Sequence, residues 1–385
     1  MLSSNLPATL YFDYAAATPV APEYATVYAD LLSRTWANPS ALHRAGRQAR
    51  GVLETARRQV ASVLNAKSSE IVFLNSATEA NNLAWQGISG GVLSSVIEHA
   101  SLQSGYGDRV VRIEPDSRGI IDVVEVEEKL KEDTRLVSLI WVQNELGSVQ
   151  PVLETGALLK TINEERTRLG LQRVYFHVDA VQAPNYYSLD VDKLGVDLLT
   201  LSAQKIYAPR GSAVLYVRTG TSLRPLLQGG GQEKGLWSGT PNVAAHALLA
   251  KALETTQNNL DDQNAHARAL QDRLETWAVK TPGVRLNSHH TWTAPGHVHL
   301  SFAGLSQEEV LTYLDLHGVL ASAGSSCASG AAKDSDLIRY LQLPPNYTAH
   351  LRLTYGRYTT STAVEKLCVV LERLRHLAKN FEGRS

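Results

Sequence analysis

The sequence predicts an α/β protein: a mostly parallel sheet with helices on both faces, followed by a smaller α+β domain. The main observation is that short apolar runs of strand length alternate with helical patterns as far as residue 217. This alternation is typical of βαβ units, which cover both faces of a parallel sheet with helices. Two long helical patterns, near 241–257 and 261–279, then lead into a region with fewer strands. That change of pattern predicts the second domain.

The first domain is expected to begin with two helices, near 23–34 and near 44–64. A strand over 71–74 follows, and Asn75–Glu79 forms the turn that begins the next helix. The other strands are expected over 92–97, 109–113, 135–142, 173–178, 197–202 and 212–217, with helices near 122–132 and 151–165.

The second domain is expected to contain strands over 297–302 and 351–354, with a helix at 306–317 between them. A final helix is expected to begin at the capping pattern Thr362-x-x-Glu365. The predicted boundaries are a large domain over 23–260 and a small domain over 261–385, to which residues 1–22 also belong.

The composition is that of an ordinary globular protein. Apolar residues make up 44% and charged residues 19% of the 385 residues, and the formal net charge is −1. A charge this close to zero argues against a broad nucleic-acid or acidic-membrane surface. Met1–Leu10 lacks the features of a secretory signal, and no run of 18 apolar residues predicts a membrane span. We therefore expect a cytoplasmic protein with no direct contact with membranes or nucleic acid.

The two cysteines lie far apart and in different settings, so we expect neither a disulfide framework nor a metal site. Cys327 lies among serine, alanine and glycine, in a segment over 322–336 that predicts a mobile, exposed loop. An exposed thiol oxidises readily, which favours a functional cysteine over a merely tolerated one. Cys368 lies on the apolar stripe of the last helix, where a packed, unreactive thiol is expected.

Two strand ends carry the residues with the clearest chemistry. Phe176-His-Val-Asp179 ends in a carboxylate, and Leu199-Thr-Leu-Ser202-Ala-Gln204-Lys205 ends in a hydroxyl and an amine. Ligands of α/β folds bind where parallel strands end. A lysine there can form a Schiff base with pyridoxal phosphate, while an aspartate keeps the pyridinium nitrogen protonated. Two ordinary strand ends with solvated polar tips explain these residues equally well by themselves.

The turn at Asn75–Glu79 also allows two interpretations. Its serine and threonine are good helix caps, and capping alone would explain them. A helix N-terminus also offers free N–H groups and a favourable dipole, so the same turn can bind a phosphate.

A series of short motifs runs through nearly the whole chain. They are Tyr11-Phe-Asp-Tyr-Ala-Ala, Asn38-Pro-Ser, His43, Ser76-Ala-Thr-Glu-Ala-Asn-Asn, Glu98-His99, Asn144-Glu-Leu-Gly, His177-Val-Asp-Ala-Val-Gln, Ser202 with Lys205, Gly229-Gly-Gly-Gln-Glu, Ser238-Gly-Thr-Pro-Asn, Gly324-Ser-Ser-Cys327 and Arg352. In this order they resemble the cysteine desulfurases of the class-V aminotransferase family, which are fold type I pyridoxal-phosphate enzymes. The resemblance is closest to the group with a long cysteine loop that supplies sulfur for iron–sulfur cluster assembly.

The resemblance implies a role for each matching residue around the cofactor. Lys205 would carry pyridoxal 5'-phosphate and move a proton at the substrate's Cα. Asp179 would pair with the pyridinium nitrogen, Gln182 would contact the ring hydroxyl, and Asn144 would lie beside it. His99 would stack on the ring and is a candidate acid–base group.

The phosphate would be bound by Ala77, Thr78, Ser202 and Gln204. Thr240 would reach the phosphate of the other subunit, which implies a homodimer.

The resemblance also implies how substrate and sulfur are handled. Asn144 and Arg352 would fix the carboxylate of L-cysteine, since a guanidinium binds a carboxylate bidentately. Cys327 would attack the substrate sulfur and carry it as a persulfide to an acceptor protein. That acceptor would be an iron–sulfur scaffold or a thiolation enzyme.

Two positions depart from the family pattern. Gln204 stands where the family usually has histidine; its amide can donate to a phosphate but cannot titrate. Trp237 stands where the family usually has arginine, so a positive charge near the mouth of the site is expected to be missing. Two other functions stay open: an aminotransferase or lyase of this family acting on another amino acid, and a degenerate member kept as a scaffold in a sulfur-transfer complex.

Overall fold

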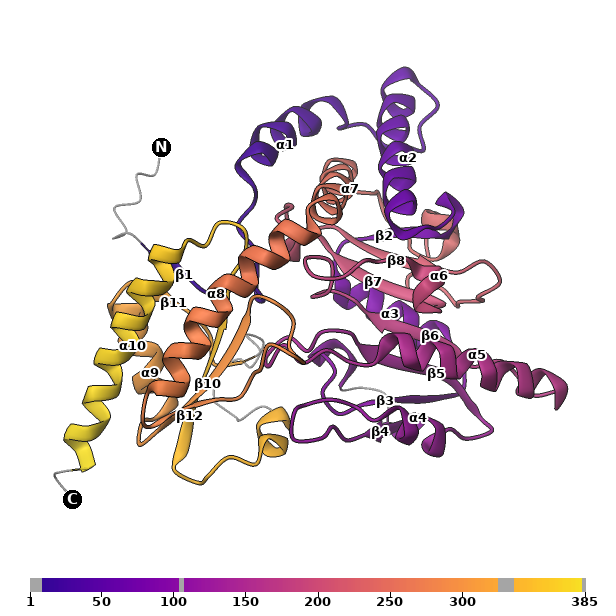
Figure 1. Cartoon of the computed structure of the whole chain (residues 1–385). Coiled ribbons are helices and arrows are strands. Elements are labelled where there is room, and N and C mark those ends of the chain that lie inside the picture. The colour runs from indigo at the N-terminus through magenta and orange to yellow at the C-terminus, as the bar shows by residue number, and fades with distance from the viewer. Residues whose placement is uncertain (1–8, 104–106, 325–335, 383–385) are drawn as a thin grey trace.

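The computed structural model describes residues 9–103, 107–324 and 336–382. Figure 1 shows a large α/β part around one central sheet, and beside it a smaller part in which β10, β12, α8, α9 and α10 pack together. Each part has its own hydrophobic core, which agrees with the predicted fold class. The boundary predicted at residue 260 stays a prediction.

The central sheet has seven strands in the order β2-β8-β7-β6-β5-β3-β4. Their bounds are β2 Ile71–Leu74, β3 Gly91–Ser95, β4 Val110–Ile113, β5 Thr134–Ile140, β6 Tyr175–Asp179, β7 Leu198–Ser202 and β8 Ala213–Val217. All pairs are parallel except those of β8, which runs antiparallel to both β2 and β7. The residues between β7 and β8 are too few for the crossover that parallel strands need, so β8 must turn back.

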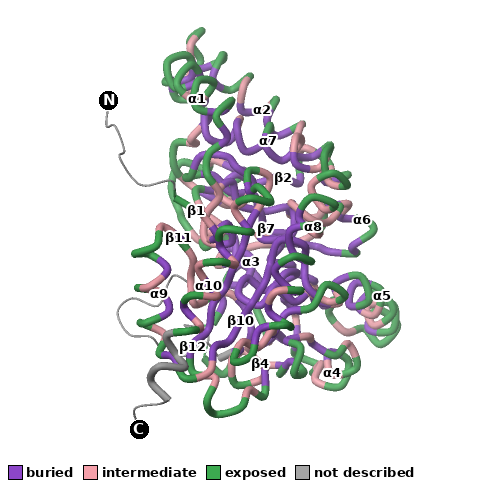
Figure 2. Tube along the Cα trace, turned by 60° about the vertical axis from the view of Figure 1, so that its left-hand side comes forward, coloured by how far each residue is buried: buried purple, intermediate pink, exposed green. Residues whose placement is uncertain are grey.

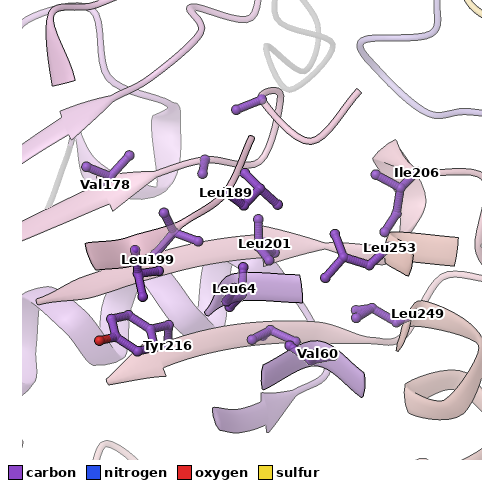
Figure 3. Close-up of a cluster of buried hydrophobic side chains, with 14 of the residues drawn as sticks. Val60, Leu64, Val178, Leu189, Leu199, Leu201, Ile206, Tyr216, Leu249 and Leu253 are labelled. Carbon is purple, nitrogen blue, oxygen red and sulfur yellow. The ribbon is translucent and has the colours of Figure 1, made fainter. Parts of the chain in front are cut away.

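Helices cover both faces of this sheet, as predicted. On one face, Val60 and Leu64 of α2 (Arg44–Leu64) and Leu249 of α7 (Val243–Asn258) pack over β7 and β8 (Figure 3). On the other face, Leu83 and Trp85 of α3 (Ala77–Gly87) lie in a separate cluster. Along each strand, successive side chains point to opposite faces, so alternate residues belong to one hydrophobic cluster or the other.

The remaining helices of the large part lie around these layers. They are α1 Pro22–Arg34, α4 Val123–Lys129, α5 Val152–Arg168 and α6 Val191–Leu194. Helix α1 projects away from the sheet in Figure 1, and only Tyr24 and Leu31 of it are buried. Figure 2 accordingly shows an exposed tube around α1 and a buried one through the central strands.

The smaller part is built on an antiparallel sheet in the order β12-β10-β9, with bounds Tyr347–Thr354, His297–Ala303 and Val284–Leu286. Its helices are α8 Leu260–Lys280, α9 Gln307–Leu316 and α10 Ser361–Glu382. A short parallel pair, β1 (Leu10–Tyr11) with β11 (Val319–Leu320), brings the N-terminal segment to the same core. The strands β1, β9 and β11 are too short to be found from periodicity.

The start of α10 differs from the prediction. The helix begins at Ser361, and the backbone N–H of Ala363 donates to Oγ1 of Thr360 at 3.1 Å. The expected cap, Thr362, therefore lies inside the helix. Thr360 offers the same hydroxyl two residues earlier, so residue type alone could not choose between them.

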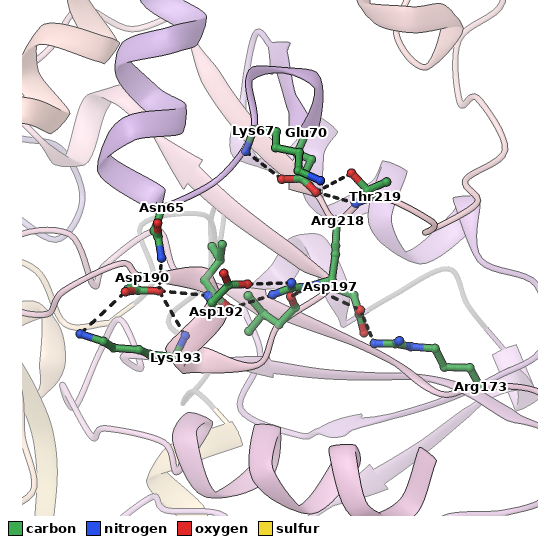
Figure 4. A network of polar contacts seen from close by, with 12 residues as sticks. Asn65, Lys67, Glu70, Arg173, Asp190, Asp192, Lys193, Asp197, Arg218 and Thr219 are labelled. Atoms are coloured by element: carbon green, nitrogen blue, oxygen red, sulfur yellow. Dashed lines mark hydrogen bonds and ion pairs between the residues drawn. The ribbon is translucent and has the colours of Figure 1, made fainter. Parts of the chain in front are cut away.

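Several ion pairs lie at the edge of the central sheet where β6 and β7 begin (Figure 4). Asp197 accepts from Arg173 Nη2 at 2.6 Å and from the backbone N–H of Phe176 at 2.9 Å. Nearby, Arg218 Nη1 donates to Asp192 Oδ1 at 2.8 Å. No helix in the described part of the chain is long and apolar enough to cross a membrane.

Candidate active site

A cavity of about 230 Å³ lies at the opposite edge of the central sheet, where β6 and β7 end. Segments from both parts of the chain line it. The predicted residues found there are Ala77, Thr78, His99, Asn144, Asp179, Gln182, Ser202, Gln204, Lys205 and Arg352. Strand ends that are far apart in the sequence thus bring together the residues that the motifs singled out.

Asp179 is the last residue of β6 and is almost fully buried. Its Oδ2 accepts from Nδ2 of Asn81 at 2.7 Å, and its Oδ1 accepts from the backbone N–H of Val181 at 3.0 Å. Both of these donors are neutral. A buried carboxylate held by neutral donors is suited to receive a cationic ring nitrogen, because burial strengthens the attraction.

Lys205 lies in the short 3₁₀ turn Ala203–Lys205 that follows β7. Its Nζ donates to the carbonyl oxygens of Ala15 and Ala16, at 2.7 and 2.6 Å. Nε2 of Gln182 also donates to the Ala15 carbonyl, at 2.9 Å. The N-terminal segment therefore enters the cavity and contacts both side chains, which nothing in their local sequence indicates.

His99 is held with a defined ring orientation. Its Nδ1 accepts from the backbone N–H of Ser101 at 3.2 Å and lies 2.9 Å from the Ser101 hydroxyl. A neutral ring in this arrangement carries its proton on Nε2. Burial lowers the pKa of His99, the charge of Asp179 opposes this, and the charge of Lys205 lowers the pKa further. The imidazole is therefore neutral at neutral pH.

Ala77 and Thr78 are the first two residues of α3. The first N–H groups of a helix have no acceptor within the helix, and the helix dipole favours an anion there. The preceding Ser76 caps the helix, since its Oγ accepts from the backbone N–H of Glu79 at 3.3 Å. Capping and anion binding are compatible here, because the cap uses the Glu79 N–H and leaves those of Ala77 and Thr78.

Arg352, on β12, is 1% exposed and reaches the cavity from the smaller part of the chain. Its Nη1 donates to the carbonyl oxygen of Asn144 at 2.9 Å, and its Nη2 donates to Oδ1 of Asp13 at 2.6 Å. Within the described residues its buried Nε has no hydrogen-bond partner. A buried guanidinium with an unused donor is a site for a carboxylate.

Two of the residues singled out from the sequence, Thr240 and Trp237, lie away from this cavity. Thr240 is exposed and does not line this cavity. Trp237 is buried in the cluster under α3, so its ring does not occupy the mouth of the cavity. Cys327 lies outside the described residues, as does most of the segment 322–336. Cys368 is half-buried against the smaller core, and burial raises the pKa of its thiol to about 11, as expected of an unreactive cysteine.

Sequence reasoning gave no role to several residues of the cavity. Asn81 lies three residues after Thr78 on α3, and helical spacing could have placed it on the same face. Its Nδ2 also donates to Oγ of Ser101 at 3.0 Å, so Asn81 links Asp179 to the serine that holds His99. Asp13 belongs to the motif Tyr11-Phe-Asp-Tyr-Ala-Ala and does not line the cavity; no local signal could reveal its contact with Arg352, which is 339 residues away.

Comparisons with known proteins agree with the resemblance seen in the motifs. The family model for class-V aminotransferases matches residues 10–367. The chain is 34% identical to a cysteine desulfurase IscS of Dictyoglomus turgidum over 381 residues, which cover 95% of this chain and 94% of that protein.

Two solved structures are similar to the fold described above. One is a NifS-like protein from Rickettsia africae, with a TM-score of 0.86 and 27% identity over 95% of this chain and 99% of that one. The other is SspA in complex with cysteine, with a TM-score of 0.77 and 29% identity over 91% of this chain and 100% of that one.

Proposed function

The chain belongs to the class-V aminotransferase family, and we propose that within it this protein is a pyridoxal-phosphate-dependent cysteine desulfurase. It would convert L-cysteine to L-alanine and pass the sulfur to Cys327 as a persulfide. The observation that carries the proposal is that Lys205, Asp179 and the buried Arg352 line one cavity. Together they meet the needs of an amino-acid substrate bound through a pyridoxal cofactor.

The residues of the cavity fit the cofactor. The N-terminus of α3, with Ala77 and Thr78, would hold the phosphate, helped by Ser202 and Gln204. Asp179 would hold the ring nitrogen, and Gln182 and Asn144 would lie beside the ring hydroxyl. When bound, the cofactor would act as an electron sink during bond breaking in the substrate.

Lys205 would attach the cofactor and move the proton at the substrate's Cα. The carbonyl oxygens of Ala15 and Ala16 accept from its Nζ, so the amine has a defined position whenever it is not attached. His99 would stack on the ring and present its Nε2 to the substrate, because Nδ1 is already used by Ser101.

The substrate carboxylate would bind to Arg352. The guanidinium is oriented by Asp13 and by the Asn144 carbonyl, and its buried Nε lacks a partner among the described residues. An incoming carboxylate would satisfy that donor and place the rest of the amino acid toward Lys205. The acidic partner, Asp13, keeps the positive charge of Arg352 balanced before substrate arrives.

The sulfur step balances without an added oxidant or reductant. The Cys327 thiolate would attack the substrate sulfur, so an S–S bond forms as the Cβ–S bond breaks. The Cβ carbon keeps the electron pair of the broken bond and gains a proton, which gives alanine. An ordinary thiol, with a pKa near ~8.5, supplies only a few per cent of thiolate at neutral pH.

We also propose a homodimer. Trp36 is 76% exposed and Leu42 is 80% exposed, both between α1 and α2. Residues Pro39 and Ser40 line the same surface hollow as Gln232 and Pro241. Pro241 follows Thr240 directly, and Oε1 of Gln232 accepts from the backbone N–H of Gly239, which precedes Thr240. The exposed apolar segment and Thr240 therefore share a face, which a second copy would cover.

The acceptor would be a protein, either an iron–sulfur scaffold or an enzyme of a thiolation pathway, as the similarity to a cysteine desulfurase IscS suggests. A cytoplasmic location is part of the proposal, since the chain has only two cysteines in unrelated settings. No direct contact with membranes or nucleic acid is proposed.

The decisive test compares Cys327→Ser with Cys368→Ser after incubation with L-cysteine. Mass spectrometry should find the added sulfur on the peptide containing Cys327, and only Cys327→Ser should stop alanine formation. Sulfur on Cys368, or normal turnover by Cys327→Ser, would contradict the proposal. Amino-group transfer to a keto acid without C–S cleavage would indicate an aminotransferase instead. Failure to bind pyridoxal phosphate would indicate a scaffold.

A further inference from the structure

Strand β8 begins between the two segments that would hold the cofactor phosphate. Ala213, its first residue, pairs with Leu74 at the end of β2 and with Ser202 at the end of β7. The chain after Leu74 turns into α3, whereas the chain after Ser202 forms the turn that carries Lys205. Ser212, directly before Ala213, therefore lies between these two segments, and it lines the cavity with both.

A histidine from another element holds Ser212. The Ser212 Oγ lies 2.7 Å from Nδ1 of His246 on α7, and both residues are buried. The His246 ring also stacks on Phe73, with the ring centroids 4.5 Å apart. Burial lowers the pKa of His246 to about 3, and the charge of Arg57 lowers it in the same direction. The ring is therefore neutral at neutral pH, with one donor nitrogen and one acceptor nitrogen.

We propose that Ser212 donates a hydrogen bond to the phosphate of the bound cofactor, and that His246 is the positioning residue behind it. In the bound arrangement, Nδ1–H of His246 donates to Oγ of Ser212, so the serine O–H is free to donate to a phosphate oxygen. A chain of two hydrogen bonds in one direction strengthens both of them. The inference rests on the proposed function, because it needs a phosphate monoester in the cavity.

A further feature of the site supports this assignment. The residues Arg210 and Gly211, which precede Ser212, also line the cavity, so the same turn brings a positive charge to the anion. His246 does not itself line the cavity, so it can act on the anion only through its contact with Ser212.

The test compares two ligands that differ only in the phosphate. Dissociation constants of pyridoxal phosphate and of pyridoxal are measured for the full-length cofactor-free protein by fluorescence quenching. Ser212→Ala should weaken the binding of pyridoxal phosphate by on the order of tenfold, as expected for a lost hydrogen bond to a charged group. It should leave the affinity for pyridoxal unchanged. Ser212→Thr, which keeps the hydroxyl, should restore the preference for the phosphorylated ligand.

Ser138 offers a matched control within the same sheet. Its Oγ lies 2.8 Å from Nδ1 of His177, and both residues are buried outside the cavity. Ser138→Ala therefore removes the same kind of hydrogen bond, together with one that Ser138 Oγ accepts from Nε1 of Trp85, and should not change the ratio of the affinities for pyridoxal phosphate and pyridoxal. His246→Phe keeps a ring against Phe73 and should lower the affinity for pyridoxal phosphate relative to that for pyridoxal. In protein that already carries Ser212→Ala, His246→Phe should cause no further loss of affinity for pyridoxal phosphate.

A spectroscopic measurement tests the role of His246 without turnover. Addition of inorganic phosphate to ¹⁵N-histidine-labelled, cofactor-free protein should shift His246 toward the form protonated on Nδ1.

In the binding experiment, two results would overturn the inference while leaving the proposed function intact. One is that Ser212→Ala loses affinity for pyridoxal phosphate and pyridoxal equally; the other is that it loses no affinity for pyridoxal phosphate. A wild-type protein that binds no pyridoxal phosphate would overturn both the inference and the proposed function.

Discussion

At one edge of the central sheet, Asp197 lies just before β7, and at the other edge Asp179 ends β6. Both carboxylates are almost completely buried. Asp197 pairs with the guanidinium of Arg173 and accepts from the backbone N–H of Phe176, as Figure 4 shows for its ion pairs. Asp179 accepts only from neutral donors in the described residues, one of them on Asn81.

The two edges also differ in how many buried polar atoms are left over. Within the described residues, Nε of Arg352, Oδ1 of Asn81 and Oε2 of Glu98 have no hydrogen-bond partner. All three lie at or beside the cavity, whereas Asp197 and Arg218 have no such atoms. Unpaired buried polar groups lower the free energy of unfolding, so the cavity edge keeps groups that can bind a ligand at a cost in stability. At the opposite edge, the buried carboxylate of Asp197 is paired with Arg173 and stabilises the fold.

The largest effect is expected from Lys205→Ala. Turnover should fall by roughly 10²–10⁴-fold from the lost proton transfer alone, and the cofactor should no longer become attached. The free energy of unfolding should change little, because Lys205 is outside the hydrophobic clusters. Borohydride reduction and peptide mapping of the wild type should find the cofactor on Lys205. Attachment to another lysine would remove Lys205 from this role.

The second largest effect is expected on substrate binding, from replacement of Arg352 at the cavity edge. Arg352→Ala should lose about 2–5 kcal/mol of transition-state binding for L-cysteine, because a buried carboxylate would lack its partner. The loss should be found in kcat/KM. Arg352→Lys keeps the charge but not the bidentate geometry, so it should recover only part of the loss. An unchanged kcat/KM in the alanine variant would exclude Arg352 from the substrate site.

Asp197→Ala should have the opposite profile. Without the carboxylate, the backbone N–H of Phe176 is left buried and unpaired, which should cost about 2 kcal/mol of stability. Chemical denaturation measures this loss, and kcat/KM per folded protein should be unchanged. If Asp197→Ala lowered kcat/KM and left stability at the wild-type value, the conclusion that Asp197 serves stability and not catalysis would be wrong.

The smallest effect concerns pH. Burial raises the pKa of Glu98 to about 8, although hydrogen bonds from Ser95 and from the backbone N–H of Ile140 act in the opposite direction. Folding therefore favours the protonated form. Stability is lost as pH rises from roughly 4.3, the unfolded value, to about 8, the folded value. Glu98→Gln has no such proton to lose.

The measurement is a set of denaturation curves for wild type and Glu98→Gln at several pH values. The stability of the variant relative to wild type should increase as pH rises through this window. A constant difference between them would mean that Glu98 is not the group that makes the cavity edge sensitive to pH.

The sequence alone determined the succession of strands and helices along the chain and the residues that end β6 and β7, but not the order of the strands within the sheet or the antiparallel direction of β8. Periodicity and turn residues are local signals, so Asp179 and Lys205 could be placed at strand ends without any knowledge of packing. The motifs likewise singled out Arg352, Ala77 and His99.

Only the tertiary structure decided which distant residues meet. Asp13 pairs with Arg352 across 339 residues, and Ser212 meets His246 because α7 folds back over β8. The carbonyls of Ala15 and Ala16 reach Lys205 in the same way. Such contacts depend on how whole elements pack, because packing, and not local sequence, fixes which side chains share a buried space.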